Sequence, residues 1–192
     1  MALTKPIARM TVPEYVAFEE KADVRHELLD GEVFAMAGGT PEHAALMASV
    51  SHLLSLALRG KPCRVFSSDL RVRIHATRLT TYPDVTVVCG KLELDADDRL
   101  AATNPIVIVE VLSETTASYD RGAKAAHYRR VPSLMEYVLV AQDEQRIEVH
   151  RRVADRWEIH DAVPGQAIPL VSIGVELDVA EVYRDPLAPA VG

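Results

Sequence analysis

The segment Ile106-Val-Ile-Val-Glu-Val-Leu112 decides the fold class, because it is continuously apolar apart from one carboxylate, Glu110. A short apolar run of this kind is typical of a β-strand that is buried on both faces. Val85 to Val88 is a second run of the same type. Two such strands predict a sheet with other elements packed on its faces.

Helices are predicted on both sides of this segment along the chain. Thr11-Val-Pro-Glu14 has the capping-box pattern, so a short helix should extend to about Lys21. Thr40-Pro41 predicts the start of a longer helix, since proline is tolerated at the first helical position, and Gly60 should end it. A third helix is expected over residues 119–130.

Strand and turn signals fill much of the remaining sequence. Asp30-Gly31 stands between two extended runs and predicts a tight N-terminal hairpin, because both residues tolerate positive φ. Arg71 and Arg73 alternate with apolar residues, which predicts a half-buried strand. The acidic stretch 91–104 is expected to be a solvated loop. Further strands are predicted over residues 136–140, 146–151 and 157–161.

The order of these elements predicts an α/β or α+β fold, with a sheet that carries helices on its faces and an N-terminal hairpin. No repeat or linker interrupts residues 11–183. The length of 192 residues is also ordinary for one domain. We therefore predict a single domain over residues 1–192, with its core over about 11–183.

Composition and charge exclude several classes of protein. The hydrophobic and charged fractions, 48% and 26%, are those of a globular chain rather than a disordered one. The net charge of −7 disfavours non-specific coating of DNA. The longest uncharged run, 43–58, is shorter than the roughly 20 residues that span a bilayer. We therefore expect no membrane contact. Cys63 and Cys89 form no disulfide framework by their spacing, which predicts a cytoplasmic protein.

Glu110 is the anomaly within its strand, since a carboxylate among apolar residues must be solvated, paired or bound to a metal. Asp84 starts the preceding predicted strand. If the two strands pair antiparallel, both carboxylates converge at one end of the sheet, where they could hold Mg²⁺ or Mn²⁺ with water and phosphate. The alternatives are a structural ion pair for Glu110 and a turn or cap for Asp84.

Lys124 could complete a site with these two acids. Glu110 lies about 7 Å before its strand end, and Lys124 about 7.5 Å into the following helix, so the two side chains would be level if the helix folds back over the sheet. Asp120, Lys124 and Tyr128 share one helix face by their i, i+4 spacing. The alternative for Lys124 is a surface ion pair with Asp120.

Taken together, these residues resemble the Uma-type family of restriction endonucleases, which belongs to the PD-(D/E)XK nuclease superfamily. The likeness covers nearly the whole chain, and it depends on the joint order of short motifs. These motifs are Arg25-His-Glu-Leu-Leu-Asp-Gly-Glu32, Pro41-Glu-His43, Pro83-Asp84, Val109-Glu110-Val-Leu-Ser113, Tyr119-Asp120-Arg-Gly-Ala-Lys124, Tyr128 and Glu136-Tyr137.

The resemblance implies a restriction-endonuclease-like fold, with a mixed central sheet, flanking helices and a divalent-metal site. Asp84 and Glu110 match the metal-binding carboxylates of the superfamily, and Glu27 is the candidate for an additional acid from an N-terminal element. Leu112 stands where the motif would have its lysine. The family's substitute, a helix lysine, maps onto Lys124.

Other residues are weaker candidates for the site. His43, near the start of the long helix, could donate to phosphate or line the site, although a packed or capping histidine is the alternative. Asp120 and Tyr128 would line the site beside Lys124. Arginines could supply phosphate contacts; the candidates are Arg71, Arg73, Arg129 and Arg130.

The leading functional hypothesis is Mg²⁺- or Mn²⁺-dependent hydrolysis of DNA phosphodiester bonds, with Asp84 and Glu110 holding the cation and Lys124 assisting the attacking water. A homodimer is expected, because many nucleases cut two strands by two-fold pairing. The rival hypothesis is a catalytically silent module that binds nucleic acid or a protein partner. A third hypothesis is a small-molecule hydrolase with the same site, since fold does not fix the substrate.

Overall fold

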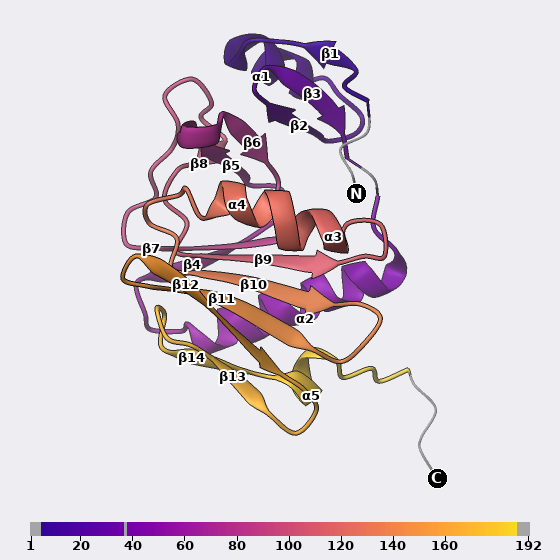
Figure 1. The fold of residues 1–192 in the computed structure, drawn as a ribbon, viewed down its shortest axis with the longest axis vertical. Helices are drawn as coiled ribbons and strands as arrows, with labels where there is room; N and C mark the ends of the chain where they lie inside the picture. The colour runs from indigo at the N-terminus through magenta and orange to yellow at the C-terminus, as the bar shows by residue number, and fades with distance from the viewer. Residues whose placement is uncertain (1–4, 37, 188–192) are drawn as a thin grey trace.

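The computed structural model describes residues 5–36 and 38–187. Its strands form two six-stranded sheets and a two-stranded ribbon, as Figure 1 shows. Helices pack against both faces of one six-stranded sheet, which we call the central sheet. The other six-stranded sheet, at the top of Figure 1, contains the N-terminal hairpin and is called the N-terminal sheet.

The central sheet has the strand order β12-β11-β10-β9-β7-β4. Strands β9 and β10 are parallel, and the other neighbours are antiparallel, so the predicted mixed sheet is confirmed. Its strands are β4 (Cys63–Ser67), β7 (Val85–Cys89), β9 (Val107–Leu112), β10 (Glu136–Ala141), β11 (Ile147–Val153) and β12 (Arg156–Ala162).

The two faces of the central sheet have separate hydrophobic cores, because successive side chains of a strand point to opposite faces. Val107, Val109 and Val111 of β9 pack on the face that helix α2 (Pro41–Ala57) covers. Ile108 and Leu112 pack on the other face, against helix α4 (Ala125–Tyr128). Figure 1 shows these helices on opposite sides of the sheet. Glu110 has the same parity as Ile108 and Leu112, so it points toward α4.

The helix expected over 119–130 differs from the prediction in its bounds and its form. It starts earlier, with α3 (Ala117–Tyr119), continues through a π-helical turn η2 (Asp120–Lys124), and ends with α4. The helices predicted from Thr11 and Thr40 are present as α1 (Val12–Glu19) and α2. The Thr40 side chain accepts a hydrogen bond from the backbone N–H of His43 at 3.1 Å, as an N-cap residue does.

The N-terminal sheet has the order β1-β3-β2-β6-β5-β8 and is larger than the predicted hairpin. Asp30 and Gly31 turn the chain with φ of 49° and 84°, which confirms the hairpin. A 3₁₀ turn, η1 (His75–Thr77), separates β5 from β6. The strands are β1 (Ala8–Arg9), β2 (His26–Leu29), β3 (Glu32–Ala35), β5 (Arg71–Ile74), β6 (Leu79–Thr81) and β8 (Ala101–Ala102).

Strand β5 corrects two predictions. Arg71 and Arg73 are 3% and 9% exposed, so the strand is buried rather than half-buried. Arg71 forms an ion pair with the buried Asp98 at 2.7 Å and donates to the Tyr82 hydroxyl at 3.1 Å, which compensates its desolvation. The stretch 91–104 is therefore no simple solvated loop, and neither arginine is available for the predicted phosphate contact.

The sequence analysis missed the elements that follow β12. A ribbon of β13 (Ala167–Leu170) and β14 (Val175–Asp178) leads into helix α5 (Val179–Val182). Their buried residues belong to the same core as the inner face of α2. They complete the cover of that sheet face. Within the described residues, no helix has the length and apolar character needed to cross a membrane.

The structure also corrects the prediction for the cysteines, because Cys63 and Cys89 form a disulfide. The β4–β7 register places them directly opposite each other, a contact that spacing in the sequence does not show. Reduction should lower the free energy of unfolding by about 3.5 kcal/mol, the loop entropy expected for a sequence separation of 26. Urea unfolding with and without reductant measures this loss.

Cys63→Ser is the control for this experiment, since its stability should not respond to reductant. Native protein whose thiols react with a thiol reagent before any reductant is added would contradict the disulfide.

Candidate functional site

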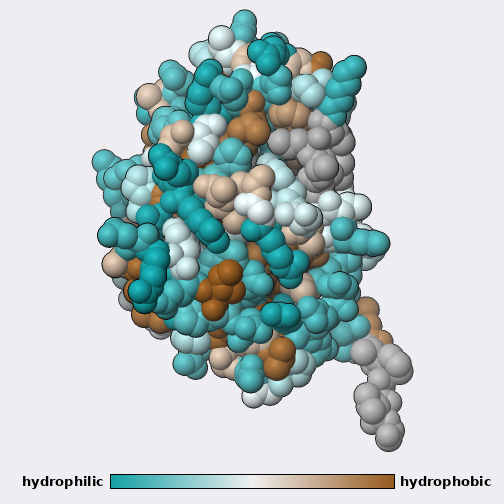
Figure 2. Space-filling view, in the orientation of Figure 1, coloured by the Kyte–Doolittle hydropathy of each residue, from teal (hydrophilic) through white to brown (hydrophobic). Residues whose placement is uncertain are grey.

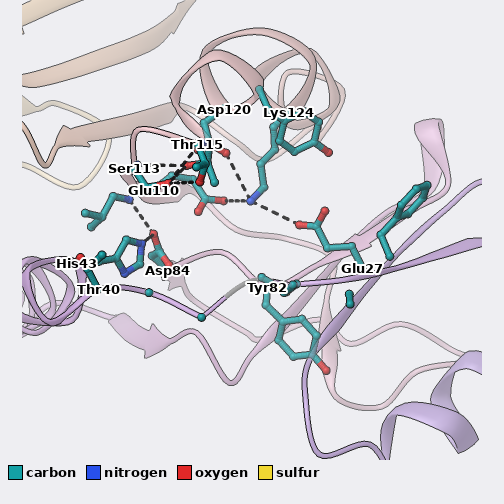
Figure 3. A pocket seen from close by; sticks show the side chains of 18 residues that line it. Glu27, Thr40, His43, Tyr82, Asp84, Glu110, Ser113, Thr115, Asp120 and Lys124 are labelled. Carbon is teal, nitrogen blue, oxygen red and sulfur yellow. Dashed lines mark hydrogen bonds and ion pairs between the residues drawn. The ribbon is translucent and has the colours of Figure 1, made fainter. Parts of the chain in front are cut away.

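The candidate site lies where β9 ends and β7 begins. Val85 pairs with Val109 in antiparallel register, which brings Asp84, one residue earlier, beside Glu110, one residue later. Asp84 Oδ2 accepts a hydrogen bond from the backbone N–H of Val111 at 2.7 Å. The two carboxylates therefore lie on neighbouring strands at one end of the central sheet, as Figure 3 shows.

Lys124 reaches this end of the sheet from the turn η2. Its Nζ lies 2.9 Å from Glu110 Oε1, 3.5 Å from Glu27 Oε1 and 3.8 Å from Asp120 Oδ1. Tyr128, one helical turn further, donates its hydroxyl to Glu110 Oε1 at 2.6 Å. Lys124 is 6% exposed, so its charge interacts with these carboxylates away from bulk water.

Glu27 comes from the N-terminal sheet and approaches Lys124 from the side opposite to Glu110 (Figure 3). It is 5% exposed and accepts a hydrogen bond from the Thr81 hydroxyl. The Glu27–Lys124 ion pair thus joins the N-terminal sheet to the helix that covers the central sheet. Glu27 points at Lys124 and not at the Asp84–Glu110 pair.

His43 contacts the other side of the pair, with its Nε2 3.2 Å from Asp84 Oδ2. Gly39 lies against this ring, because a Cβ at Gly39 would be 2.8 Å from His43 Nδ1. Asp120, Tyr128 and His43, the three weaker candidates, therefore all contact an acid or the lysine of the site. Arg129 and Arg130 directly follow α4, at the C-terminal end of the helix that carries Lys124.

Acid groups outnumber basic ones at the site, with Glu27, Asp84, Glu110 and Asp120 against Lys124 and the His43 imidazole. Burial raises the pKa of Glu110 to about 8, against the opposing effect of the Lys124 charge. Burial also raises the pKa of Asp120. Burial alone would lower the pKa of Lys124, but Glu110, Glu27 and Asp120 outweigh it and raise that pKa. Lys124 therefore stays protonated while an excess of buried acid surrounds it.

A cavity of about 200 Å³ adjoins these side chains. Hydroxyl residues that the sequence analysis missed line its wall; they are Thr40, Ser113, Thr115, Thr116 and Tyr119. The hydroxyls of Ser113 and Thr116 lie 3.0 Å apart, in the turn that follows β9. A Ser/Thr cluster directly after the strand of Glu110 was the signal that could have identified this wall.

The donor set fits a Mg²⁺ or Mn²⁺ ion that takes few protein ligands. In residues 5–36 and 38–187, no three His, Cys, Asp or Glu side chains are grouped to hold one cation. Mg²⁺ commonly uses one or two carboxylates and completes its shell with water and substrate phosphate. Asp84 and Glu110, beside a cavity with hydroxyl side chains in its wall, supply that number of carboxylates.

The His43–Asp84 contact leads to a pH-dependent prediction. The hydrogen bond to Asp84 raises the pKa of His43, whereas burial opposes the rise. Asp84→Asn removes the charge of the acceptor, so the pKa of His43 should fall. Titration of the ring by NMR measures the change. Asp97→Asn, at an exposed aspartate outside the site, is the control and should leave the titration of His43 as it is.

Comparison with known proteins places the chain in a family. The model of the Uma2 family, described as "Putative restriction endonuclease", matches residues 12–180. The chain belongs to the Uma2 family. The match includes every residue of the candidate site, from Glu27 to Tyr128.

Two relatives of this Uma2 chain come from Synechocystis and are both described as uncharacterized proteins. The protein slr1290 is 34% identical over 183 residues, which cover 93% of this chain and 94% of the relative. The protein sll1609 is 35% identical over 147 residues, covering 77% and 83%.

A crystal structure from Anabaena variabilis, described as "a putative nuclease belonging to DUF820", has the same fold. It superposes with a TM-score of 0.72 and 16% identity, covering 91% of this chain and 97% of that one. At this identity the likeness concerns the fold, and it confirms the predicted restriction-endonuclease-like architecture.

Proposed function

We propose that the protein is a Mg²⁺- or Mn²⁺-dependent endonuclease that hydrolyses phosphodiester bonds of DNA. The observation that carries the proposal is the Asp84–Glu110 pair on neighbouring strands, with the Lys124 ammonium 2.9 Å from Glu110 and a cavity beside it that hydroxyl side chains help to line. Membership of a family described as restriction endonucleases supports it.

Asp84 and Glu110 would hold the cation, with Glu27 as the candidate for a supplementary acid. A bound divalent cation would lower the pKa of a water molecule and stabilise charge on the phosphate. Asp84 is held in place by the Val111 N–H and His43. Tyr128 and Lys124 both contact Glu110 at its Oε1 atom. The other carboxylate oxygen, Oε2, would then face the cation.

Lys124 would orient the attacking water or neutralise charge on the scissile phosphate. Its raised pKa keeps it protonated, so it acts as an electrostatic and hydrogen-bonding group and not as a nucleophile. The Ser113, Thr115 and Thr116 hydroxyls line the cavity and can donate to phosphate oxygens.

Cleavage of plasmid and linear DNA by the purified protein tests the proposal. Cutting should require Mg²⁺ or Mn²⁺ and stop on addition of EDTA. Absence of cutting of any DNA form with either metal would favour the silent binding module. The expected homodimer, which would present two sites to two strands, is measured by light scattering of the same preparation.

A further inference from the structure

We propose that the outward face of the α3–η2–α4 helix, together with Trp157 of β12, binds the phosphate backbone of duplex DNA. The inference rests on the proposed function and extends it, since these residues lie outside the cavity. We call this region the helix face; it consists of Arg121, Gly122, Ala123, Ala126, Arg129, Arg130, Arg152 and Trp157.

Arginines on the helix face differ from most others on the protein surface in their partners. Arg129, Arg130 and Arg152 have no carboxylate within 4.0 Å among the described residues, and Arg121 has one only at 3.8 Å, on Glu148. Elsewhere, seven arginines of the surface form ion pairs, such as Arg9 with Glu32 at 2.6 Å, whereas Arg59, Arg64 and Arg99 have none among the described residues. A protein of net charge −7 thus has a local excess of positive charge on this face.

Arg152 and Arg129 are held rigidly by the fold. Arg152 donates to the carbonyl oxygens of Leu134, Arg129 and Val131 at 2.8–3.0 Å, which closes the C-terminal end of the helix. Arg129 contacts His150 Nδ1 at 3.0 Å. Neither Arg129 nor Arg152 has a direct carboxylate partner among the described residues, although His150 itself contacts Glu148 Oε1 at 2.6 Å.

Trp157 contacts both arginines. The guanidinium carbons of Arg129 and Arg152 are 5.8 Å and 4.7 Å from its ring centroid. Such cation–π contacts hold the guanidinium groups against an aromatic ring. Ile159, beside Trp157 on the same strand face, is 60% exposed, so none of the described elements covers it.

The shape of the helix face also suits a rod-like anion. Gly122, Ala123 and Ala126 are exposed. None of them has a long side chain that would keep a phosphate backbone away from the helix. In Figure 2, pale and light-brown residues lie where Figure 1 draws this helix, with hydrophilic residues beside them. Arg121 of η2 and Arg130, two residues after the end of α4, are also exposed.

The helix face begins on the same helix that carries Lys124 into the site. Arg130 is about 9 Å beyond Lys124 along the helix, at roughly 1.5 Å per residue. One strand of DNA advances about 3.4 Å per phosphate along the duplex axis. Measured along this axis, Arg130 lies about three phosphates from the level of Lys124, whose side chain is buried on the inner side of the helix.

Fluorescence anisotropy with a labelled DNA duplex of about 20 base pairs, in EDTA to prevent cutting, tests the inference. Arg121→Gln with Arg130→Gln should weaken binding about tenfold near 100 mM salt and reduce the salt slope by about 2, one per lost phosphate contact. The matched control removes the same charge elsewhere, with Arg59→Gln and Lys91→Gln at exposed positions. The control variant should bind DNA with an affinity within about twofold of the native chain, because it loses no phosphate contact.

Hydrolysis of bis(p-nitrophenyl) phosphate separates this inference from the proposed function, because so small a diester does not reach the helix face. The double variant should keep this activity while it loses DNA binding. If the double variant binds DNA like the control, the inference is wrong even where the native chain cuts DNA. If the native chain hydrolyses neither DNA nor the small diester, the proposed function is wrong whatever the binding experiment gives.

Discussion

Glu110→Gln should reduce metal-dependent DNA cleavage at least about a hundredfold, since even outer-shell partners of a metal site contribute about 10- to 100-fold. The substitution keeps the size of the side chain and removes the charge that holds the cation. The fold should persist, because the amide oxygen can still accept from Tyr128, and Lys124 keeps Glu27 and Asp120 as partners. Cleavage rates at several Mg²⁺ concentrations measure the effect.

Glu114→Gln is the matched control, because Glu114 is exposed and lies four residues beyond Glu110 in the sequence. It should cut DNA like the native chain. If Glu110→Gln also cuts at the native rate, Glu110 is not a metal ligand and the site proposed above is wrong.

The sequence predicted those parts of the fold that depend on local signals. Asp30-Gly31 form the expected turn because both adopt positive φ, and Thr40 caps α2 because its side chain reaches the His43 N–H. The apolar run that contains Glu110 is a buried strand because no alternation marks a solvated face. Each signal is contained within a few residues.

Predictions failed where distant contacts decide the outcome. Arg71 was predicted to lie on the exposed face of a half-buried strand. Asp98, 27 residues away, forms an ion pair with it, and this pair compensates the desolvation of the buried guanidinium. The Cys63–Cys89 bond depends on the register of β4 and β7, which no spacing rule supplies. The ribbon β13–β14 has short strands whose partners are only each other, so its pattern was weak.

The candidate site was predictable in part for the same reason. Asp84 and Glu110 meet because two consecutive strands pair. The position of Lys124 beside Glu110 followed from comparing the rise per residue along the strand with the rise along the helix. The approach of Glu27 depends on how the N-terminal sheet packs against the helix, and only the family resemblance indicated it. The hydroxyl wall around Ser113 was recognised only once the folded chain showed the cavity, although the Ser/Thr cluster after the strand of Glu110 is its signal in the sequence.

Lys124→Met should both slow cleavage and destabilise the fold. Methionine has similar length but no charge, so Glu27, Glu110 and Asp120 lose the cation they share. Breaking a buried pair by removing one partner costs about 3–5 kcal/mol, because the remaining charge is left uncompensated. Urea unfolding should show a loss of this size. The rate of DNA cleavage should fall more than the affinity for metal, because Lys124 acts on the water and the phosphate.

The loss of stability should grow with pH. Lys124 is the largest influence that lowers the pKa of Glu110, so this pKa rises further in the variant. A carboxyl whose pKa is raised on folding holds a proton that the unfolded chain releases above its ordinary value of 4.5. Native chain and variant therefore both lose stability from about pH 4.5, but this loss ends near the Glu110 pKa of about 8 in the native chain and continues to higher pH in the variant, so the difference grows above about pH 8. Glu110→Gln combined with Lys124→Met should recover part of the loss, since one of the unpaired acids is gone. Lys91→Met, at an exposed lysine, is the control. If Lys124→Met is as stable as this control at pH 8, Lys124 does not compensate the buried acids.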